Sequence, residues 1–389
     1  MKADQIANNK HIMKILQSRA FAGIGASLIA LGCQSAFAQS SVTLYGVADV
    51  SVRYLTNANA NNDGKVFMTN GAITNNRIGF KGSEDLGGGL KAIFQLEGGV
   101  ELENGQHSDS ARAFNRAAFV GLSSHYGTLT LGRQKTPLFD MLGDTYDPLT
   151  VGNYFENAWL PVALGAGLYA DNAVKYNGMF AGLTIGAMYS FGTNYTATGP
   201  GGFSGQVSGH MGAGKYGFTA SYAMGPLSIG GGYQQNSDNA SNKQKIWNAN
   251  AVYAIGPAKL YVGYLHSTDD TGFVDSILNQ RGLVAGADIL KGSGRRDDGP
   301  FAGVTYQLTP ALLLTGAFYY DHVKNAAIGG GATGSGNRYT GVALAEYALS
   351  KRTEVHGTVD FNKVTGAGDV ELPGRSNQTG VSIGLRNIF

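Results

Sequence analysis

The chain has 389 residues, of which 59 are Gly, 20 are Tyr, 18 are Phe and one is Cys. Charged residues make up 14% of the sequence and hydrophobic residues 43%. Gly without a three-residue period excludes collagen, and the hydrophobic content excludes a disordered chain. Few charges together with much Tyr, Phe, Thr and Gly favour an all-β fold over a soluble α/β enzyme, because helices favour Ala, Glu, Lys and Leu.

The first 38 residues have the three-part layout of a secretory signal peptide. Basic residues open the segment, an apolar run follows at residues 20–31, and a small-x-small cleavage motif closes it at residues 36–38. The apolar run is too short to span a bilayer. We therefore expect export of a single domain, residues 39–389, with either Met1 or Met13 as the start.

Removal of this leader changes the charge of the chain. The whole sequence carries 29 basic and 27 acidic residues, a net charge of +2, and residues 1–38 hold four of the basic residues and one acidic residue. The domain that remains has a net charge of −1 and contains no Cys. We expect no nucleic-acid partner, no disulfide and no Cys-ligated metal.

Past residue 38 the chain alternates apolar and polar residues in segments of about ten, the pattern of a membrane β-barrel. Residues 42–53 and 90–97 are clear examples. A soluble β-sandwich would show the same alternation of apolar and polar residues, so the lengths of the connections between strands must distinguish the two folds. Seven are short, at residues 82–89, 123–127, 178–182, 224–226, 255–258, 309–311 and 350–352, and eight longer polar segments centre near residues 65, 107, 150, 203, 240, 283, 330 and 370.

Short turns at one end and long loops at the other are typical of outer-membrane barrels. Fifteen connections predict 16 antiparallel strands, with both termini at the short-turn end. Proline supports the assignment because it cannot donate to a strand ladder. No proline falls inside a proposed strand, and Pro300 opens one.

Several blocks of the sequence resemble the general porins of Gram-negative outer membranes, in particular the betaproteobacterial and neisserial type. They are SVTLYGVA (41–48), RIGFKGSEDLGGGLKAIF (77–94), NRAAFVGL (115–122), TLTLGRQKT (128–136), YALSKRT (347–353) and GLRNIF (384–389). The resemblance implies a homotrimer of 16-stranded transmembrane β-barrels, with the third long loop folded inward, that passes small hydrophilic solutes and ions through a water-filled channel in outer-membrane lipid. It also implies that the terminal Phe389 is an assembly signal.

The third long segment runs from Lys135 to about residue 170, a length that usually indicates function. Thr136 suits a helix N-cap, Pro137 the first helical position and Gly143 the stop, so we expect a helix of one or two turns here. Folded into the lumen, the segment would narrow it. Its acidic residues Asp140, Asp144, Asp147 and Glu156 would then supply negative charge at a constriction.

The resemblance places opposing arginines on the early strands, at Arg77 and Arg116, with Arg133 as a further candidate. Charges facing each other across a constriction favour polar solutes over apolar ones. Arg77 alternates with Ile78 and points into the lumen. Strict alternation aims Arg116 and Arg133 at lipid, so either a bulge shifts the register or both lie near the polar rim.

No motif indicates catalysis, a metal site or a cofactor. The histidines lack the i,i+4 spacing of a metal pair, and no Ser and His stand in a recognisable catalytic context. The sequence thus predicts a non-specific porin and no enzyme. One rival hypothesis is a substrate-specific porin. Another is a barrel adhesin or an outer-membrane enzyme, in which the loops and not the lumen would carry the function.

Overall fold

In the computed structural model, the described residues are 41–71, 73–151, 154, 157, 168–192, 214–283 and 290–389, so the expected signal peptide, residues 1–38, lies outside them. Nearly all regular structure is antiparallel strand. The elements are β1 (Ser41–Leu55), β2 (Lys65–Asn70), β3 (Arg77–Gly87), β4 (Leu90–Gly99), β5 (Ala117–Ser124), β6 (Gly127–Lys135), α2 (Pro137–Met141), η1 (Leu142–Tyr146), β7 (Tyr169–Phe180), β8 (Leu183–Ser190), β9 (Gly214–Met224), β10 (Leu227–Ser237), β11 (Lys243–Ile255), β12 (Ala258–Asp269), α4 (Phe273–Leu278), β13 (Arg295–Thr309), β14 (Leu312–Gly329), β15 (Ala332–Ala348), β16 (Thr353–Gly366), η2 (Ala367–Glu371) and β17 (Asn377–Ile388).

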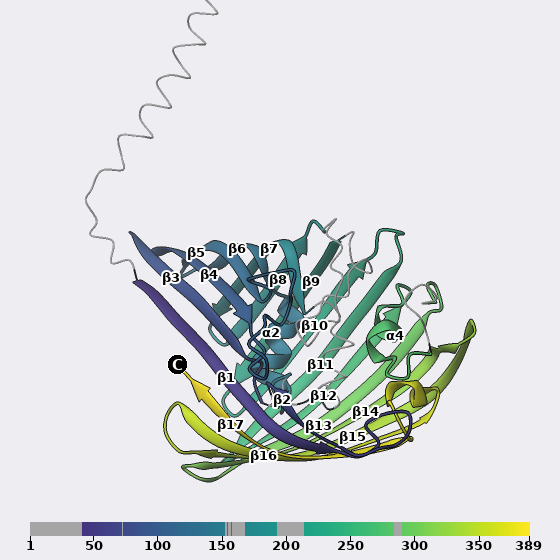
Figure 1. Cartoon of the computed structure of the whole chain (residues 1–389). Coiled ribbons are helices and arrows are strands. Elements are labelled where there is room, and N and C mark those ends of the chain that lie inside the picture. The colour runs from purple at the N-terminus through teal and green to yellow at the C-terminus, as the bar shows by residue number, and fades with distance from the viewer. Residues whose placement is uncertain are drawn as a thin grey trace, which may run out of the picture.

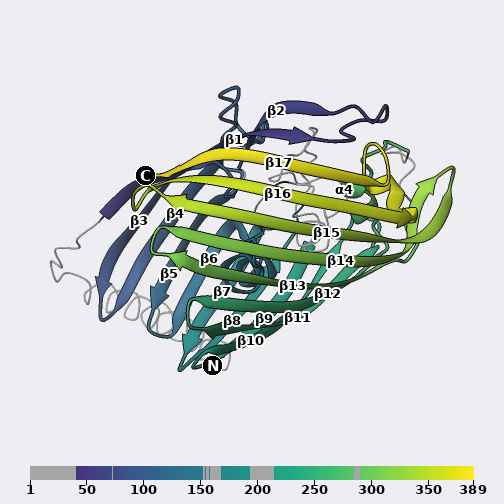
Figure 2. The same cartoon turned by 90° about the horizontal axis from the view of Figure 1, so that it is seen from below.

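The sheet closes on itself between its first and last strands. β1 pairs with β17 from Val47 opposite Ile388 to Leu55 opposite Gly380. From β3 to β17 each strand pairs with the next in sequence, and β1 also pairs with β2 and β3, so the strands form a ring (Figures 1 and 2). Closure leaves no unpaired edge, which a strand in lipid could not tolerate. The predicted closed antiparallel barrel is confirmed.

The second strand of the barrel is split into two pieces. β3 pairs with the first half of β1 and β2 with the second half, both on the same flank. Counting β2 and β3 as one interrupted strand gives the predicted 16. Between them, the Asp49 carboxylate on β1 accepts hydrogen bonds from the backbone N–H of Ile73 at 2.7 Å and of Thr74 at 2.9 Å. This turn is therefore fastened to the inner wall.

The seven predicted short turns join the strands at one end of the barrel. At the other end, two of the predicted long segments are short. Only residues 238–242 separate β10 from β11, and only Gly330 and Gly331 separate β14 from β15. The sequence near residue 330 is polar and glycine-rich because β14 and β15 continue as a projecting ribbon, whose tip has positive φ at both glycines.

Pro300 lies inside β13 and does not open it, contrary to the prediction. It pairs with Tyr264 on the β12 side, while the ladder to β14 skips Gly299 and Pro300. The missing N–H therefore falls at a gap in the ladder, where it costs little.

The two faces of the wall differ in polarity. On β16, Val359 and Phe361 are about half exposed on the outer face, whereas Asp360 and Asn362 are buried on the inner face. An apolar outside and a polar inside suit a barrel in lipid around an aqueous lumen. Among the described residues, no helix has the length and apolarity needed to cross a bilayer.

Candidate functional site

The segment after β6 folds into the barrel, as Figures 1 and 2 show for α2. Thr136 caps α2 because its side chain accepts a hydrogen bond from the Phe139 N–H, and Pro137 occupies the first turn, as predicted. Gly143 does not end the helix. The chain continues through a turn of π-helix, η1, to Tyr146.

Glycines on the inner wall make room for this segment. A Cβ built on Gly230 of β10 would lie 2.7 Å from the Tyr146 hydroxyl, and one on Gly303 of β13 would lie 2.5 Å from Cγ of Pro148. Leu138, Leu142 and Tyr146 are almost fully buried, in one apolar cluster with residues of β11 to β14. The loop is therefore packed against the wall over a continuous apolar surface.

Polar contacts fix the far end of the loop. The Tyr319 hydroxyl on β14 donates to Oδ1 of Asp147, whose Oδ2 accepts from the Val151 N–H at 2.6 Å. Further along, the Tyr154 hydroxyl hydrogen-bonds Ser51 of β1 at 2.9 Å and donates to Ser382 of β17. The loop thus leaves β6, packs on the wall from β8 to β14 and reaches β1 and β17.

Burial raises the pKa of Asp147 to about 6 from an ordinary 3.8, although the Tyr319 and Val151 hydrogen bonds favour its ionised form. A raised pKa means that the docked loop favours the protonated carboxyl. The protonated carboxyl therefore stabilises the docked loop fully below the ordinary pKa of 3.8, and this stabilisation is lost as the pH rises through about 6. We expect docking to be weaker at pH 7 than at pH 4 by on the order of 3 kcal/mol.

Proteolysis of the loop across this pH range, with an acid-tolerant protease for the acid end, measures the effect. Asp147→Asn keeps the shape of the side chain without its charge and should make cleavage independent of pH. Equal pH dependence in this variant and the wild type would show that another group is responsible.

The predicted arginines gather on the wall of β3 to β7. Nε of Arg116 donates to Oε1 of Glu97 on β4 at 2.7 Å, and Arg77, partly buried, lies within electrostatic range of both. The Tyr45 hydroxyl donates to the other oxygen of Glu97 at 2.8 Å. Arg116 directly precedes β5, so strand alternation does not govern its direction.

A bulge explains the direction of Arg133. The register between β6 and β7 shifts between Gly132 and Gln134, and Gly132 has φ +132°. Arg133 is consequently buried while Leu131 stays exposed on the outer face. Its guanidinium contacts Asp171 at 2.5 Å, and its Cζ lies 5.3 Å from the centre of the Tyr169 ring. The bulge, and not the polar rim, is the alternative that the structure supports.

The acidic residues of the loop that the structure describes do not pair with these arginines. Asp140 accepts from the Lys175 ammonium, and Asp147 is buried against Tyr319. Asp144 is exposed and lies within electrostatic range of Lys135, and desolvation raises the pKa of its carboxyl. Glu156 lies outside the described residues. The structure brings Arg77, Arg116 and Arg133 together, but pairs them with Glu97 and Asp171 of the wall.

Sequence reasoning missed five charged residues of this site. Glu97 and Lys175 lie on inner faces and form the ion pairs described above. Nζ of Lys215 on β9 donates to the Tyr169 carbonyl at 2.9 Å, and Asp171 also meets Arg112 at 2.9 Å. The polar side of the alternation in β4 and β7 could have indicated Glu97 and Lys175, because inward positions there carry the charges.

The terminal Phe389, the predicted assembly signal, lies where β1 meets β17. The Phe389 N–H donates to the Gly46 carbonyl at 3.1 Å, and Gly46 returns a hydrogen bond at 3.0 Å, so the last residue lies at the β1–β17 seam. Among the described residues there is no group of three or more His, Cys, Asp or Glu suited to a metal ion.

Comparison with known proteins agrees with this architecture. The family model for Gram-negative porins matches residues 25–367. An outer membrane porin protein of Bordetella pertussis is 35% identical over 191 residues, 44% of this chain and 48% of that protein. Outer membrane porin protein 32 of Delftia acidovorans is 34% identical over 219 residues, 54% of this chain and 59% of that protein. These matches span about half the length of the two relatives.

Solved structures share the fold. The anion-selective porin from Comamonas acidovorans superposes with a TM-score of 0.71 at 23% identity, over 90% of this chain and all of that one. The trimer form of OmpT from Vibrio cholerae gives a TM-score of 0.61 at 14% identity, over 90% of this chain and 99% of that one. The family predicted from the sequence blocks is confirmed: the chain belongs to the Gram-negative porins.

Proposed function

We propose that the chain forms a water-filled channel in the outer membrane of a Gram-negative bacterium, through which small hydrophilic solutes and ions diffuse. The observation that carries the proposal is a closed barrel with an inward loop whose neighbouring wall is lined by charges. Polar lumen walls replace part of the water around a solute, whereas apolar solutes gain nothing from them. The proposal assigns the protein no enzymatic activity.

Planar bilayers test the channel directly. Purified protein should insert with stepwise increases in conductance. A folded barrel that leaves the membrane sealed would contradict the proposal. The trimer form of the Vibrio cholerae relative leads us to propose a homotrimer as well, for which the steps should come in threes.

The charges around the loop favour anions. Among the described residues that contact or lie in electrostatic range of the arginines and of the start of the inward loop, cationic side chains outnumber carboxylates. They are Arg77, Arg112, Arg116, Arg133, Lys135, Lys175 and Lys215, against Glu97, Asp140, Asp144 and Asp171. An excess of positive charge in a narrow lumen raises the local anion concentration. The Comamonas acidovorans neighbour, described as anion-selective, agrees with this proposal.

Arg77 is the informative residue for selectivity, because it forms no ion pair among the described residues. Arg77→Ala removes a charge near the ion path, worth about 0.8 kcal/mol at roughly 5 Å in water before screening. We expect the anion-to-cation permeability ratio, measured as the reversal potential in a salt gradient, to fall by about two- to fourfold.

Arg352→Ala, in a short turn at the end of the barrel, is the matched control and should leave the ratio unchanged. If Arg77→Ala does not move the reversal potential, Arg77 does not belong to the constriction.

A further inference from the structure

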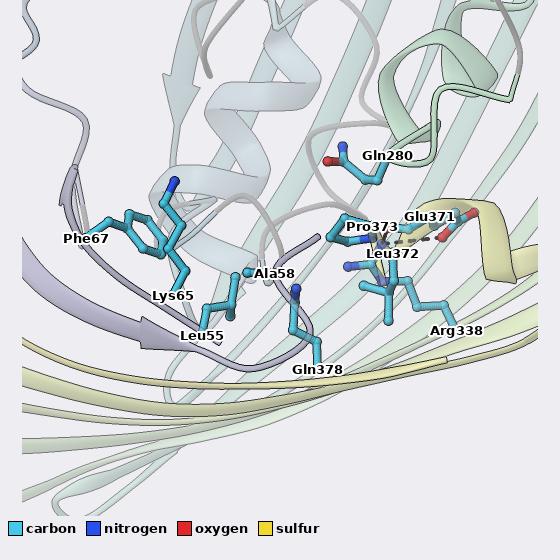
Figure 3. A pocket seen from close by; sticks show the side chains of 10 residues that line it. All are labelled: Leu55, Ala58, Lys65, Phe67, Gln280, Arg338, Glu371, Leu372, Pro373 and Gln378. Atoms are coloured by element: carbon cyan, nitrogen blue, oxygen red, sulfur yellow. Dashed lines mark hydrogen bonds and ion pairs between the residues drawn. The ribbon is translucent and has the colours of Figure 1, made fainter. Parts of the chain in front are cut away.

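A pocket of ≈ 210 Å³ opens on the inner face of the barrel at the long-loop end (Figure 3). It lies where the end of β1 and the start of β2 meet the segment after η2 and the first residues of β17. Its volume equals the room of roughly seven water molecules, too little for an oligosaccharide or a peptide. The pocket shares no lining residue with the wall that carries Arg77, Arg116 and Arg133.

The pocket contains an unused hydrogen-bond acceptor. Gln378 on β17 is 1% exposed, and its Nε2 donates to the Asn57 carbonyl at 3.3 Å. Its Oε1 accepts no hydrogen bond from any described residue. A buried acceptor without a donor costs free energy that a ligand with an N–H or O–H group would recover.

The pocket also carries a positive charge. Lys65 is exposed, and its ammonium lies 5.0 Å from the centre of the Phe67 ring with no ion pair among the described residues. The carboxylate of Glu371 meets Arg295 at 3.0 Å and Arg338 at 3.5 Å, and among the described residues it forms no ion pair with Lys65. An anionic group is therefore the natural partner for Lys65.

Apolar side chains complete the lining. Leu55 and Leu372 are buried, and Phe67, which is partly buried, also lines the pocket. This surface suits a short branched hydrocarbon group. We propose that the pocket is a binding subsite for small branched carboxylates that carry a hydroxyl or amine donor. The carboxylate pairs with Lys65, the donor bonds Oε1 of Gln378, and the hydrocarbon contacts Phe67.

Three matched solutes test the proposal on the full chain, folded in detergent, by isothermal titration calorimetry. They are α-hydroxyisovalerate, isovalerate without the hydroxyl, and α-hydroxyisovaleramide without the charge. We expect saturable binding of α-hydroxyisovalerate, with isovalerate weaker by about three- to tenfold, the worth of one hydrogen bond. Equal affinity for both acids, or no saturable binding, would overturn the proposal.

Variants of Gln378 and Lys65 test which side chain contacts which group of the solute. Gln378→Leu should abolish the preference for the hydroxy acid, and Lys65→Ala should weaken both acids while leaving the amide unchanged. Lys243→Ala, an exposed lysine at the start of β11, is the matched control and should change nothing. An unaltered preference in Gln378→Leu would also overturn the proposal. That solutes reach the pocket through the lumen rests on the proposed function. Calorimetry in detergent measures binding whether or not the barrel conducts. A barrel that binds the hydroxy acid but leaves planar bilayers sealed would therefore contradict the channel and not the binding site.

Discussion

Replacing Arg295 by alanine is expected to release two loops from the long-loop end of the barrel. Arg295 is fully buried, and its guanidinium contacts Asp275 of α4 at 2.8 Å, Asp297 of β13 at 2.7 Å and Glu371 of η2 at 3.0 Å. Without it, three buried carboxyl groups lose their shared counter-charge. Removing one partner of a buried ion pair costs about 3–5 kcal/mol.

The ion-pair network ties two loops to the wall, because Asp275 belongs to α4 and Glu371 to η2, whereas Arg295 belongs to β13. Burial raises the pKa of Glu371 even though Arg295 and Arg338 face it, so its charge depends on both arginines. Asp275 also accepts from the Ala327 N–H at 3.1 Å, which ties α4 to β14. We therefore expect the barrel to remain folded while α4 and η2 detach.

Limited trypsin digestion measures this detachment. In the wild type, Arg281 is held by the Leu372 carbonyl at 3.1 Å, and we expect cleavage after it to become rapid in Arg295→Ala. Arg296→Ala, which changes the exposed neighbour, is the matched control. Cleavage at the wild-type rate in Arg295→Ala would show that the loops are held by other contacts.

Gly230→Leu should widen the channel. The new side chain would enter the space of Tyr146, which is fully buried and hydrogen-bonded to Ser228 at 2.9 Å. Overpacking of this kind costs about 1–3 kcal/mol, and moving the loop relieves it more easily than moving the strand ladder. We expect larger single-channel conductance and a loop that is more sensitive to protease.

Gly341→Leu is the control for the glycine substitution itself, because a Cβ at Gly341 meets nothing within 4 Å. Its conductance should equal that of the wild type. An unchanged conductance in Gly230→Leu would mean that the inward loop does not limit the flow of ions.

The sequence predicted the strands and the short turns correctly, because these elements follow from local, repeating backbone geometry. Alternation and turn residues predicted the closed barrel, its short turns and the lumen-facing side of β3, because strand period and turn chemistry are local. It overestimated the loop near residue 330, since the glycines there form the tip of a ribbon. Pro300 was misplaced because the sequence does not reveal a gap in a ladder.

The site was harder to predict than the fold. The inward direction of Arg133 depends on a bulge at Gly132, which no alternation pattern contains. Likewise, Asp140 meets Lys175 and Asp147 meets Tyr319 because the loop folds back on distant strands. Such pairings depend on tertiary packing, so the sequence could name the charged residues but not their partners.

The path of the inward loop has a mechanical consequence. Hydrogen bonds around the circumference resist opening of a barrel, but they resist flattening much less. The loop packs against β10 and then reaches β1 and β17, on the other side of the ring, through Tyr154. It therefore acts as a strut across the cylinder, and the cross-section should keep its round shape when the surrounding lipid presses on it.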